Sequence, residues 1–286
     1  MYRHDAHAGN HGDVLKHAVL TLLLDRLRSA PGPRLYAETH AGAGVYRIAS
    51  GSGEPTASAA EGIGRLWARR AELPELSAYF EAIGTLSPTE TPSLYPGSPW
   101  LASRLLAPED RLLLFEIQED QAARLQDHLG GDERTAILRG NGLAGLPERL
   151  SGRERTGLIL IDPPYSHPRE DALAFDCITR IRARWPSGAI ALWYPRHADD
   201  HDRHQRRLTR LRGQARLLLS AEIKLRPMSH AVCMLGSGVA ILDGPDGIEE
   251  ALGALLPRVA ARLLRPSHDT TEEASRVPWR LGSFRQ

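Results

Sequence analysis

Short apolar segments alternate with segments of helical periodicity along most of this 286-residue chain, and the alternation limits the possible folds sharply. Residues 14–23 repeat Val, Leu and Ala at i, i+1, i+4 and i+5, which predicts a helix with one apolar stripe. Helical patterns also cover 120–129 and 171–185. The expected strands are 34–39, 112–116, 135–138, 157–161, 189–194, 216–223 and 231–242. Strands that alternate with helices predict an α/β fold with a mostly parallel twisted sheet.

Residues 51–95 do not follow this alternation of strands and helices. Between the first and second strands, Gly/Pro/Ser-rich stretches flank a helical pattern at 61–83. We therefore expect a main domain of residues 1–50 and 96–286, interrupted by a small helical insertion at 51–95. The polar C-terminal residues 265–286 are expected to be partly loose.

Composition excludes several classes of protein. The longest stretch without Asp, Glu, Lys or Arg, 227–242, is too short and too polar to span a bilayer. No apolar secretory segment follows the first residues. Cys177 and Cys233 are the two cysteines, which excludes a disulfide scaffold and a cysteine-based zinc site. We expect a cytoplasmic protein without a membrane segment.

Positive charge is concentrated in one segment. The formal net charge is +1, yet residues 180–226 contain 12 Arg or Lys against four Asp or Glu. Such a segment could contact nucleic acid. It could equally be the solvated face of a helix in a chain that uses Arg far more often than Lys.

Two features suggest a nucleoside ligand at the ends of the strands. Gly42 and Gly44 follow the strand 34–39 and precede an apparent helix, a place where ligands approach the backbone of a parallel sheet. Arg47 stands where a dinucleotide-binding motif would have its third glycine, which disfavours an NAD-linked oxidoreductase. Glu116 ends the strand 112–116, where a carboxylate could accept hydrogen bonds from ribose hydroxyls. A tight turn and a solvated strand-end Glu would explain the same residues.

The most specific motif is Asp162-Pro163-Pro164-Tyr165, directly after the apolar strand 157–161. The two prolines remove amide donors and leave carbonyl acceptors at the strand end. The Asp162 carboxylate and the Pro163 carbonyl can accept the two hydrogens of an exocyclic amine, and the Tyr165 ring can stack on the base. This arrangement suits the methylation of an amino group on a planar base.

The chain resembles the bacterial 23S ribosomal RNA adenine-N6 methyltransferase family, large-subunit type J. Besides the Asp-Pro-Pro-Tyr motif, the matching segments are Tyr2-Arg3-His4, 7–17 (HAGNHGDVLKH), 39–44 (THAGAG), 95–99 (YPGSP) and 191–195 (ALWYP). The resemblance implies a Rossmann-like class I methyltransferase that uses S-adenosylmethionine to methylate adenine N6 in 23S rRNA, with Asp162 catalytic. It also implies a cofactor site made of His17, His40, Ser98, Glu116, Asn141, Gly142 and Asp162. Asn141 departs from the family, which usually has Asp there.

The resemblance further implies that the N-terminal segment lies near the target base, with Tyr2, His4 and Lys16 on the RNA side together with Pro163 and Tyr165.

Four of the 12 histidines lie in the first 17 residues. A metal site there is disfavoured because no cysteine joins them, and we expect no metal. We also expect a monomer. Two alternatives stay open: a DNA adenine methyltransferase, and an RNA-binding protein with a vestigial cofactor fold.

Overall fold

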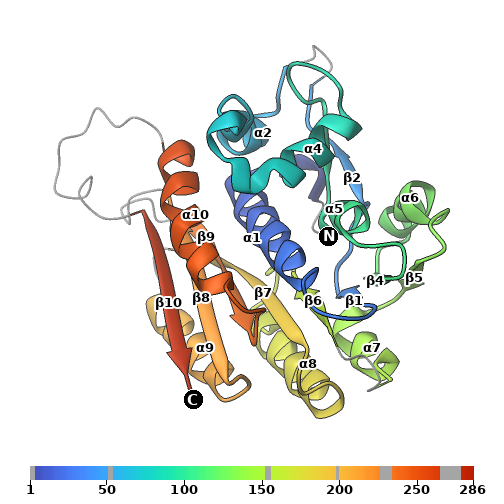
Figure 1. Ribbon diagram of the computed structural model, residues 1–286, viewed down its shortest axis with the longest axis vertical. Helices are drawn as coiled ribbons and strands as arrows, with labels where there is room; N and C mark the ends of the chain where they lie inside the picture. The colour runs from blue at the N-terminus through green and yellow to red at the C-terminus, as the bar shows by residue number, and fades with distance from the viewer. Residues whose placement is uncertain (1–3, 51–53, 152–155, 198–199, 226–233, 265–277) are drawn as a thin grey trace.

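A computed structural model describes residues 4–50, 54–151, 156–197, 200–225, 234–264 and 278–286. Within them, eight strands form one sheet in the order β10-β8-β9-β7-β6-β1-β4-β5 (Figure 1). The strands are β1 (Leu35–Glu38), β4 (Arg111–Glu116), β5 (Thr135–Arg139), β6 (Gly157–Ile161), β7 (Ala189–Arg196), β8 (Leu217–Lys224), β9 (Gly236–Leu242) and β10 (Trp279–Arg285). Strands β9 and β10 are antiparallel to their neighbours, and the rest of the sheet is parallel. The α/β class and the mostly parallel sheet are confirmed.

Helices cover both faces of the sheet and create two apolar cores. On one face lie α1 (His11–Leu27), α5 (Ser98–Leu105), α6 (Glu119–Leu129) and α10 (Ile248–Leu263). On the other lie α7 (Gly142–Arg149), α8 (Glu170–Arg184) and α9 (His201–Arg212). Strand residues alternate between the two cores because successive side chains of a strand point to opposite faces.

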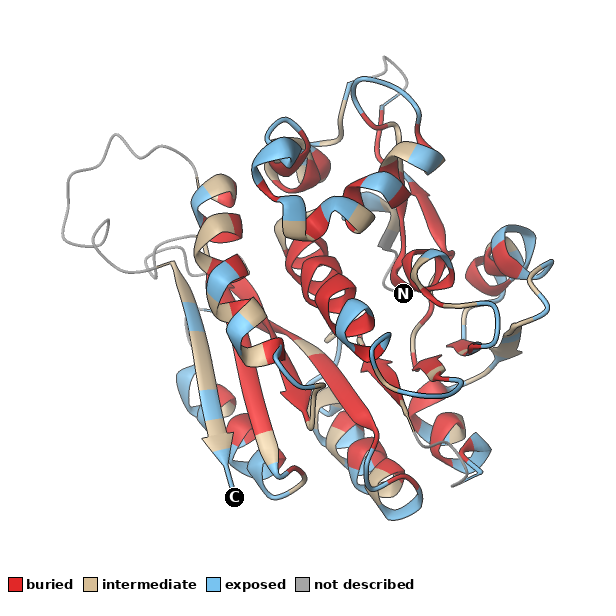
Figure 2. Ribbon diagram, viewed as in Figure 1, coloured by how far each residue is buried: buried red, intermediate tan, exposed pale blue. Residues whose placement is uncertain are grey.

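Helix α1 is buried on nearly all sides, not along one stripe as its sequence predicts (Figure 2). Besides its apolar residues it buries Asp13, Lys16 and His17. Charged side chains are rarely buried unless they are paired. All three residues line the same cavity.

The parallel strands bring four chain segments to one edge of the sheet. Glu38 at the end of β1 is in register with Leu114 of β4 and Leu160 of β6. The segments that follow β1, β4, β5 and β6 therefore emerge side by side, and they carry the glycine turn, Glu116, Asn141 and Asp162.

The expected insertion 51–95 is helical but irregular. It contains α2 (Ala57–Glu61), α3 (Ile63–Trp67), the 3-10 turns η2 (Arg70–Glu72) and η3 (Pro74–Leu76), and α4 (Ser77–Leu86). The single helix expected at 61–83 is wrong, since Gly62 and Pro74 interrupt it. The helix expected after Gly44 is also wrong, because β2 (Val45–Arg47) follows and pairs antiparallel with β3 (Leu94–Pro96).

The C-terminal part differs in detail from the sequence expectation. Residues 265–277 lie outside the described residues, and the residues after them form the edge strand β10, whose Trp279 and Leu281 pack against the core. The strand expected at 231–242 begins only at Gly236, and its residues 231–233 lie outside the description. Among the described helices, none is both long and apolar enough to cross a membrane.

Candidate active site

A cavity of about 320 Å³ lies at the edge of the sheet where β1, β4, β5 and β6 end. Its walls come from these strand ends and from α1. All seven residues expected at the cofactor site line it: His17, His40, Ser98, Glu116, Asn141, Gly142 and Asp162. Lys16 and Pro163, expected on the substrate side, line it too.

The glycine turn positions Glu116. The backbone N–H of Gly42 donates to Glu116 Oε2 at 2.8 Å, and that of Gln118 donates to Oε1 at 2.7 Å. Gly42 has a φ of +63°, and a Cβ on it would lie 2.0 Å from the Tyr46 hydroxyl. The turn therefore requires glycine. Each oxygen of Glu116 keeps a second lone pair for a ligand hydroxyl.

Asn141 and Gly142 form the adjoining wall at the start of α7. The Asn141 side chain caps the helix by accepting a hydrogen bond from the Ala144 N–H at 3.3 Å. A Cβ on Gly142 would lie 2.2 Å from the Thr39 carbonyl oxygen, so the close approach of this loop to β1 needs glycine.

Asp162 is bound by a buried lysine. Lys16 Nζ lies 2.6 Å from Asp162 Oδ2 and 3.0 Å from Asp13 Oδ1. Burial lowers the pKa of Lys16, but the two carboxylates raise it to well above its ordinary value. The ammonium group therefore stays charged and holds the Asp162 carboxylate at the cavity wall.

Sequence reasoning missed Asp13. Its carboxylate also accepts a hydrogen bond from the Gly9 N–H at 2.9 Å, and its own N–H is capped by Asn10. Asn10 is a residue type that often caps the start of a helix, and Asp13 precedes Lys16 by three residues. The sequence could therefore have predicted both the Asn10 cap and the Asp13–Lys16 ion pair.

Two tyrosines from residues 51–95 hold His17. Its Nδ1 lies 2.8 Å from the Tyr95 hydroxyl, which in turn lies 2.7 Å from the Tyr79 hydroxyl. The rings of His17 and Tyr95 stack with centroids 5.3 Å apart. This packing fixes the imidazole at the cavity wall.

His40 and Glu38 are both held neutral near pH 7. Burial lowers the pKa of His40 to about 4, and its Nδ1 lies 2.8 Å from Thr39 Oγ1. Burial raises the pKa of Glu38 to about 8, against hydrogen bonds from Tyr36 and Ser98 that favour the carboxylate. Ser98 donates to Glu38 at 3.0 Å, which orients the serine that lines the cavity.

The Asp-Pro-Pro-Tyr segment is divided between the cavity and the core. Pro163 and Pro164 line the cavity, but Tyr165 is not among the lining residues. Its hydroxyl donates to the Trp193 carbonyl at 2.9 Å, and the two rings lie 5.9 Å apart. Trp193, which sequence reasoning did not single out, lines the cavity. Tyr2 lies outside the described residues, and of His4 only the backbone is described, in η1 (His4–Ala6).

The residues present fit a nucleoside-containing cofactor. The Glu116 carboxylate can accept hydrogen bonds from hydroxyl groups, and Gly42 and Gly142 leave room beside the backbone. The exposed side chain of Ile117 offers an apolar surface next to Glu116. In the part of the chain that the structure describes, no group of three or more His, Cys, Asp or Glu side chains is arranged to hold a metal ion.

Known proteins are similar to this chain in sequence. A family model described as "Ribosomal RNA large subunit methyltransferase D, RlmJ" matches residues 32–279. The chain is 34% identical over 267 residues to Ribosomal RNA large subunit methyltransferase J of Escherichia coli (strain K12), covering 92% of this chain and 94% of the relative. The enzyme of the same name from Haemophilus influenzae is 34% identical over 265 residues, with the same coverage.

The likeness extends to a solved structure. Protein LPL1258 from Legionella pneumophila superposes with a TM-score of 0.85 and 27% identity, covering 98% of each chain. The family model and the curated relatives span nearly the whole chain, the inserted segment included. The chain therefore belongs to the family of large-subunit ribosomal RNA methyltransferases described by the RlmJ model.

Proposed function

We propose that this protein transfers a methyl group from S-adenosylmethionine to N6 of an adenine in 23S rRNA. The observation that supports it most is the position of Asp162: it directly follows β6, at the cavity that Glu116 and Asn141 also line. S-adenosylmethionine supplies a methyl group on a sulfonium, which is already a good leaving group. Glu116 would hold the ribose hydroxyls, and Asn141 with Gly142 the adenine end.

The proposed work of the protein is to position the amine. The Pro163 carbonyl and the Asp162 carboxylate would each accept one hydrogen of the target amine, which directs its lone pair away from them. Lys16 would hold the Asp162 carboxylate in place through the contact of 2.6 Å between Nζ and Oδ2. Such positioning can supply most of the catalysis because the adenine amine needs no prior deprotonation. Asp162 can take the proton once the N–C bond has formed.

The target base must leave its stack to reach this cavity, so we propose protein-free or early-assembly 23S rRNA as the substrate. Trp193 would offer the base an aromatic surface, with Tyr165 packed against it outside the cavity lining, and Tyr2 and His4 would contact the RNA from the N-terminal side. We further propose that the protein acts as a cytoplasmic monomer, with 51–95 as an insertion into the catalytic domain.

Replacing Asp162 tests the proposal. Asp162→Asn keeps the shape of the side chain but loses the charge that orients the amine, so kcat should fall by about 100-fold or more. Cofactor affinity, measured by calorimetry, should change far less. The control is Asp176→Asn, which removes a carboxylate that is 68% exposed on α8. Activity of Asp162→Asn within twofold of wild type would contradict the role of Asp162.

A further inference from the structure

Helix α9 directs four arginines into a second pocket. Arg203 and Arg207 are four residues apart, as are Arg206 and Arg210, so these two adjacent pairs lie on neighbouring rows of one side of the helix. They line a pocket of about 400 Å³, closed on the other side by α8 residues that include Asp171 and Phe175. One carboxylate faces four guanidinium groups, so the pocket carries a strong excess of positive charge.

Two of these arginines, the buried Arg207 and the 40% exposed Arg203, each have one enclosed guanidinium nitrogen that makes no hydrogen bond to the described residues. Arg207, whose side chain is 5% exposed, donates from Nε to Asp171 Oδ1 at 2.8 Å. Arg203 pairs with the other oxygen of Asp171. Arg207 Nη1 and Arg203 Nη2 are buried, and neither has a hydrogen-bond partner among the described residues. Leaving such donors unsatisfied is costly, which favours an acceptor ligand in the pocket.

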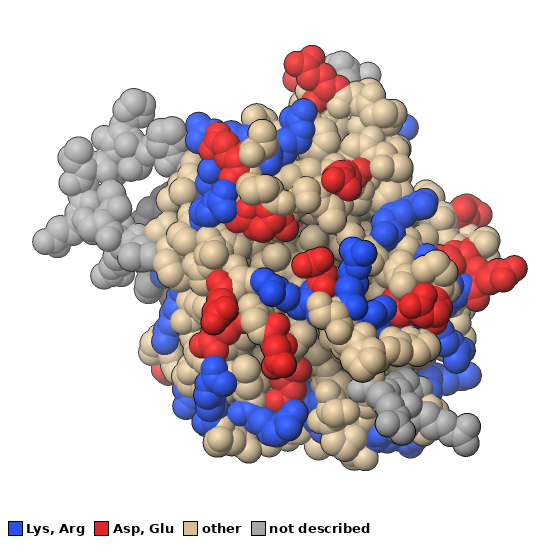
Figure 3. All heavy atoms as spheres, viewed as in Figure 1, with Lys and Arg blue, Asp and Glu red and all other residues tan. Residues whose placement is uncertain are grey.

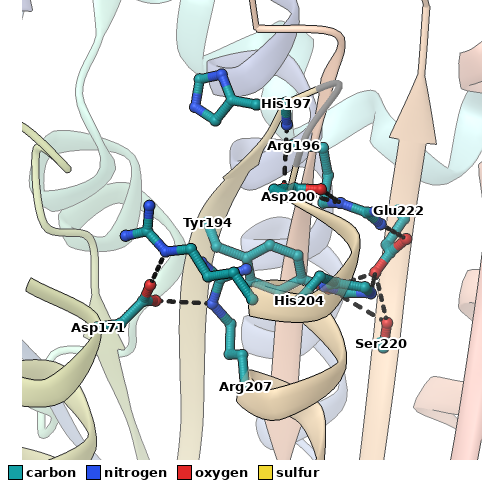
Figure 4. Close-up of polar contacts among 10 residues, drawn as sticks. Asp171, Tyr194, Arg196, His197, Asp200, His204, Arg207, Ser220 and Glu222 are labelled. Atoms are coloured by element: carbon teal, nitrogen blue, oxygen red, sulfur yellow. Dashed lines mark hydrogen bonds and ion pairs between the residues drawn. The ribbon is translucent and has the colours of Figure 1, made fainter. Parts of the chain in front are cut away.

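The arginine-bearing helix α9 is held in place by contacts with the sheet. Figure 4 shows Arg207 between Asp171 and Tyr194, with the His204–Glu222 pair beyond. The Arg207 guanidinium lies 4.6 Å from the centroid of the Tyr194 ring, and Tyr194 donates to Glu222 at 2.7 Å. His204, fully buried on α9, lies 3.0 Å from Glu222. These contacts anchor α9 to the sheet, so the pocket is formed before any ligand arrives.

The pocket adjoins the active site. Glu170 and Leu173 at the start of α8 line the active-site cavity, while Asp171 and Phe175 line the arginine pocket. The first turns of α8 therefore form a ridge between them, and an α-helix with its side chains is about 10 Å across. Arg207 also lies 5.7 Å from the ring of Tyr165. A ligand in the pocket thus lies beside the Asp-Pro-Pro-Tyr segment.

The pocket differs in charge from the face of the molecule that Figure 3 shows. On the face drawn in Figure 3, basic and acidic side chains are interspersed. The arginines of α9 instead converge on one pocket, and Arg210 stacks on Phe175 at 4.2 Å from the ring centroid. Guanidinium groups fixed in this way match the oxygens of a phosphate.

We propose that this arginine pocket binds a backbone phosphate of the RNA close to the target adenine. The proposal rests on the proposed function and adds a second anchoring point outside the catalytic cavity. An RNA chain that crosses the α8 ridge would place its target base in the cavity and a neighbouring phosphodiester among the four arginines.

The test removes two exposed arginines of the pocket, since Arg207 supports the fold through Asp171. The Arg206→Gln/Arg210→Gln variant is compared with Arg212→Gln/Arg216→Gln, which removes the same charge from the same basic segment at positions that do not line the pocket. The dissociation constant for protein-free 23S rRNA is measured by filter binding over a range of salt concentrations, and steady-state methylation is measured alongside.

For the pocket variant we expect a dissociation constant about tenfold higher and a shallower salt dependence, as the loss of a phosphate contact predicts. KM for RNA should rise while kcat and cofactor affinity stay near wild type, and the control variant should bind RNA almost normally. Equal losses in both variants, or no loss in the pocket variant, would overturn the proposal. Because binding is measured without the methyl donor, the pocket is tested even if the wild type transfers no methyl group to RNA.

Discussion

At the scale of single residues, the sequence indicates which side chains form the site and the partners that lie three residues away, but not the partners that are distant in the chain. The sequence singled out Lys16 as a group on the RNA side. The structure shows it buried between Asp13 and Asp162, which lie on opposite sides of it in the chain. The Lys16–Asp162 contact joins residues 146 positions apart and depends on how α1 packs across the end of β6. No local sequence pattern predicts such a contact.

Lys16→Met should destabilise the protein by about 3 kcal/mol, because it leaves two enclosed carboxylates without their cation. Urea denaturation with and without the second substitution Asp13→Asn measures this. The double variant should recover part of the loss, since one uncompensated charge is removed. Equal stability of wild type and Lys16→Met would mean that the ion pair contributes nothing to the fold.

At the scale of elements, the sequence predicted the strands well because buried parallel strands are short apolar runs. It failed where tertiary contacts decide the structure. The turn at Gly44 leads into β2 because Val45 and Tyr46 pair with β3 some 50 residues later, and β10 is a half-polar strand that only its register with β8 reveals. Glu116, Asn141 and Asp162 line one cavity because the ends of neighbouring parallel strands share one edge, while His17 and Ser98, which the resemblance implied, reach the cavity from α1 and α5.

The start of α7 offers a test at this scale. Asn141→Asp keeps the helix cap and adds a negative charge at the helix N-terminus, so the free energy of unfolding should rise by about 0.5 kcal/mol and cofactor binding should tighten. Asn141→Ala should lose about 1 kcal/mol with the cap and bind the cofactor more weakly. Calorimetric titration and thermal unfolding measure both effects. Weaker cofactor binding in Asn141→Asp would contradict the proposed contact with the adenine.

At the scale of the whole molecule, the buried carboxyl of Glu38 makes stability depend on pH. Its pKa is raised from 4.5 to about 8, so the native state holds a proton that the unfolded chain releases above pH 4.5. The stability contributed by protonated Glu38 is therefore complete below pH 4.5 and is lost as the pH rises to about 8.

Glu38→Gln should remove this dependence because a neutral amide can still accept from Ser98. The difference in unfolding free energy between the variant and the wild type should grow by up to about 1.4 kcal/mol per pH unit inside that window and level off above it. Chemical denaturation at a series of pH values measures the difference. A difference that does not vary with pH would show that Glu38 is ionised in the native protein.

The central claim is that the cavity methylates an adenine of ribosomal RNA, and the most direct measurement is of the product itself. The purified protein and a radiolabelled methyl donor are incubated with protein-free 23S rRNA transcribed in vitro and, separately, with unmethylated duplex DNA, and both are digested to nucleosides. We expect labelled N6-methyladenosine from the RNA alone. Label in the DNA, label in another nucleoside, or no label despite measurable cofactor binding would contradict it.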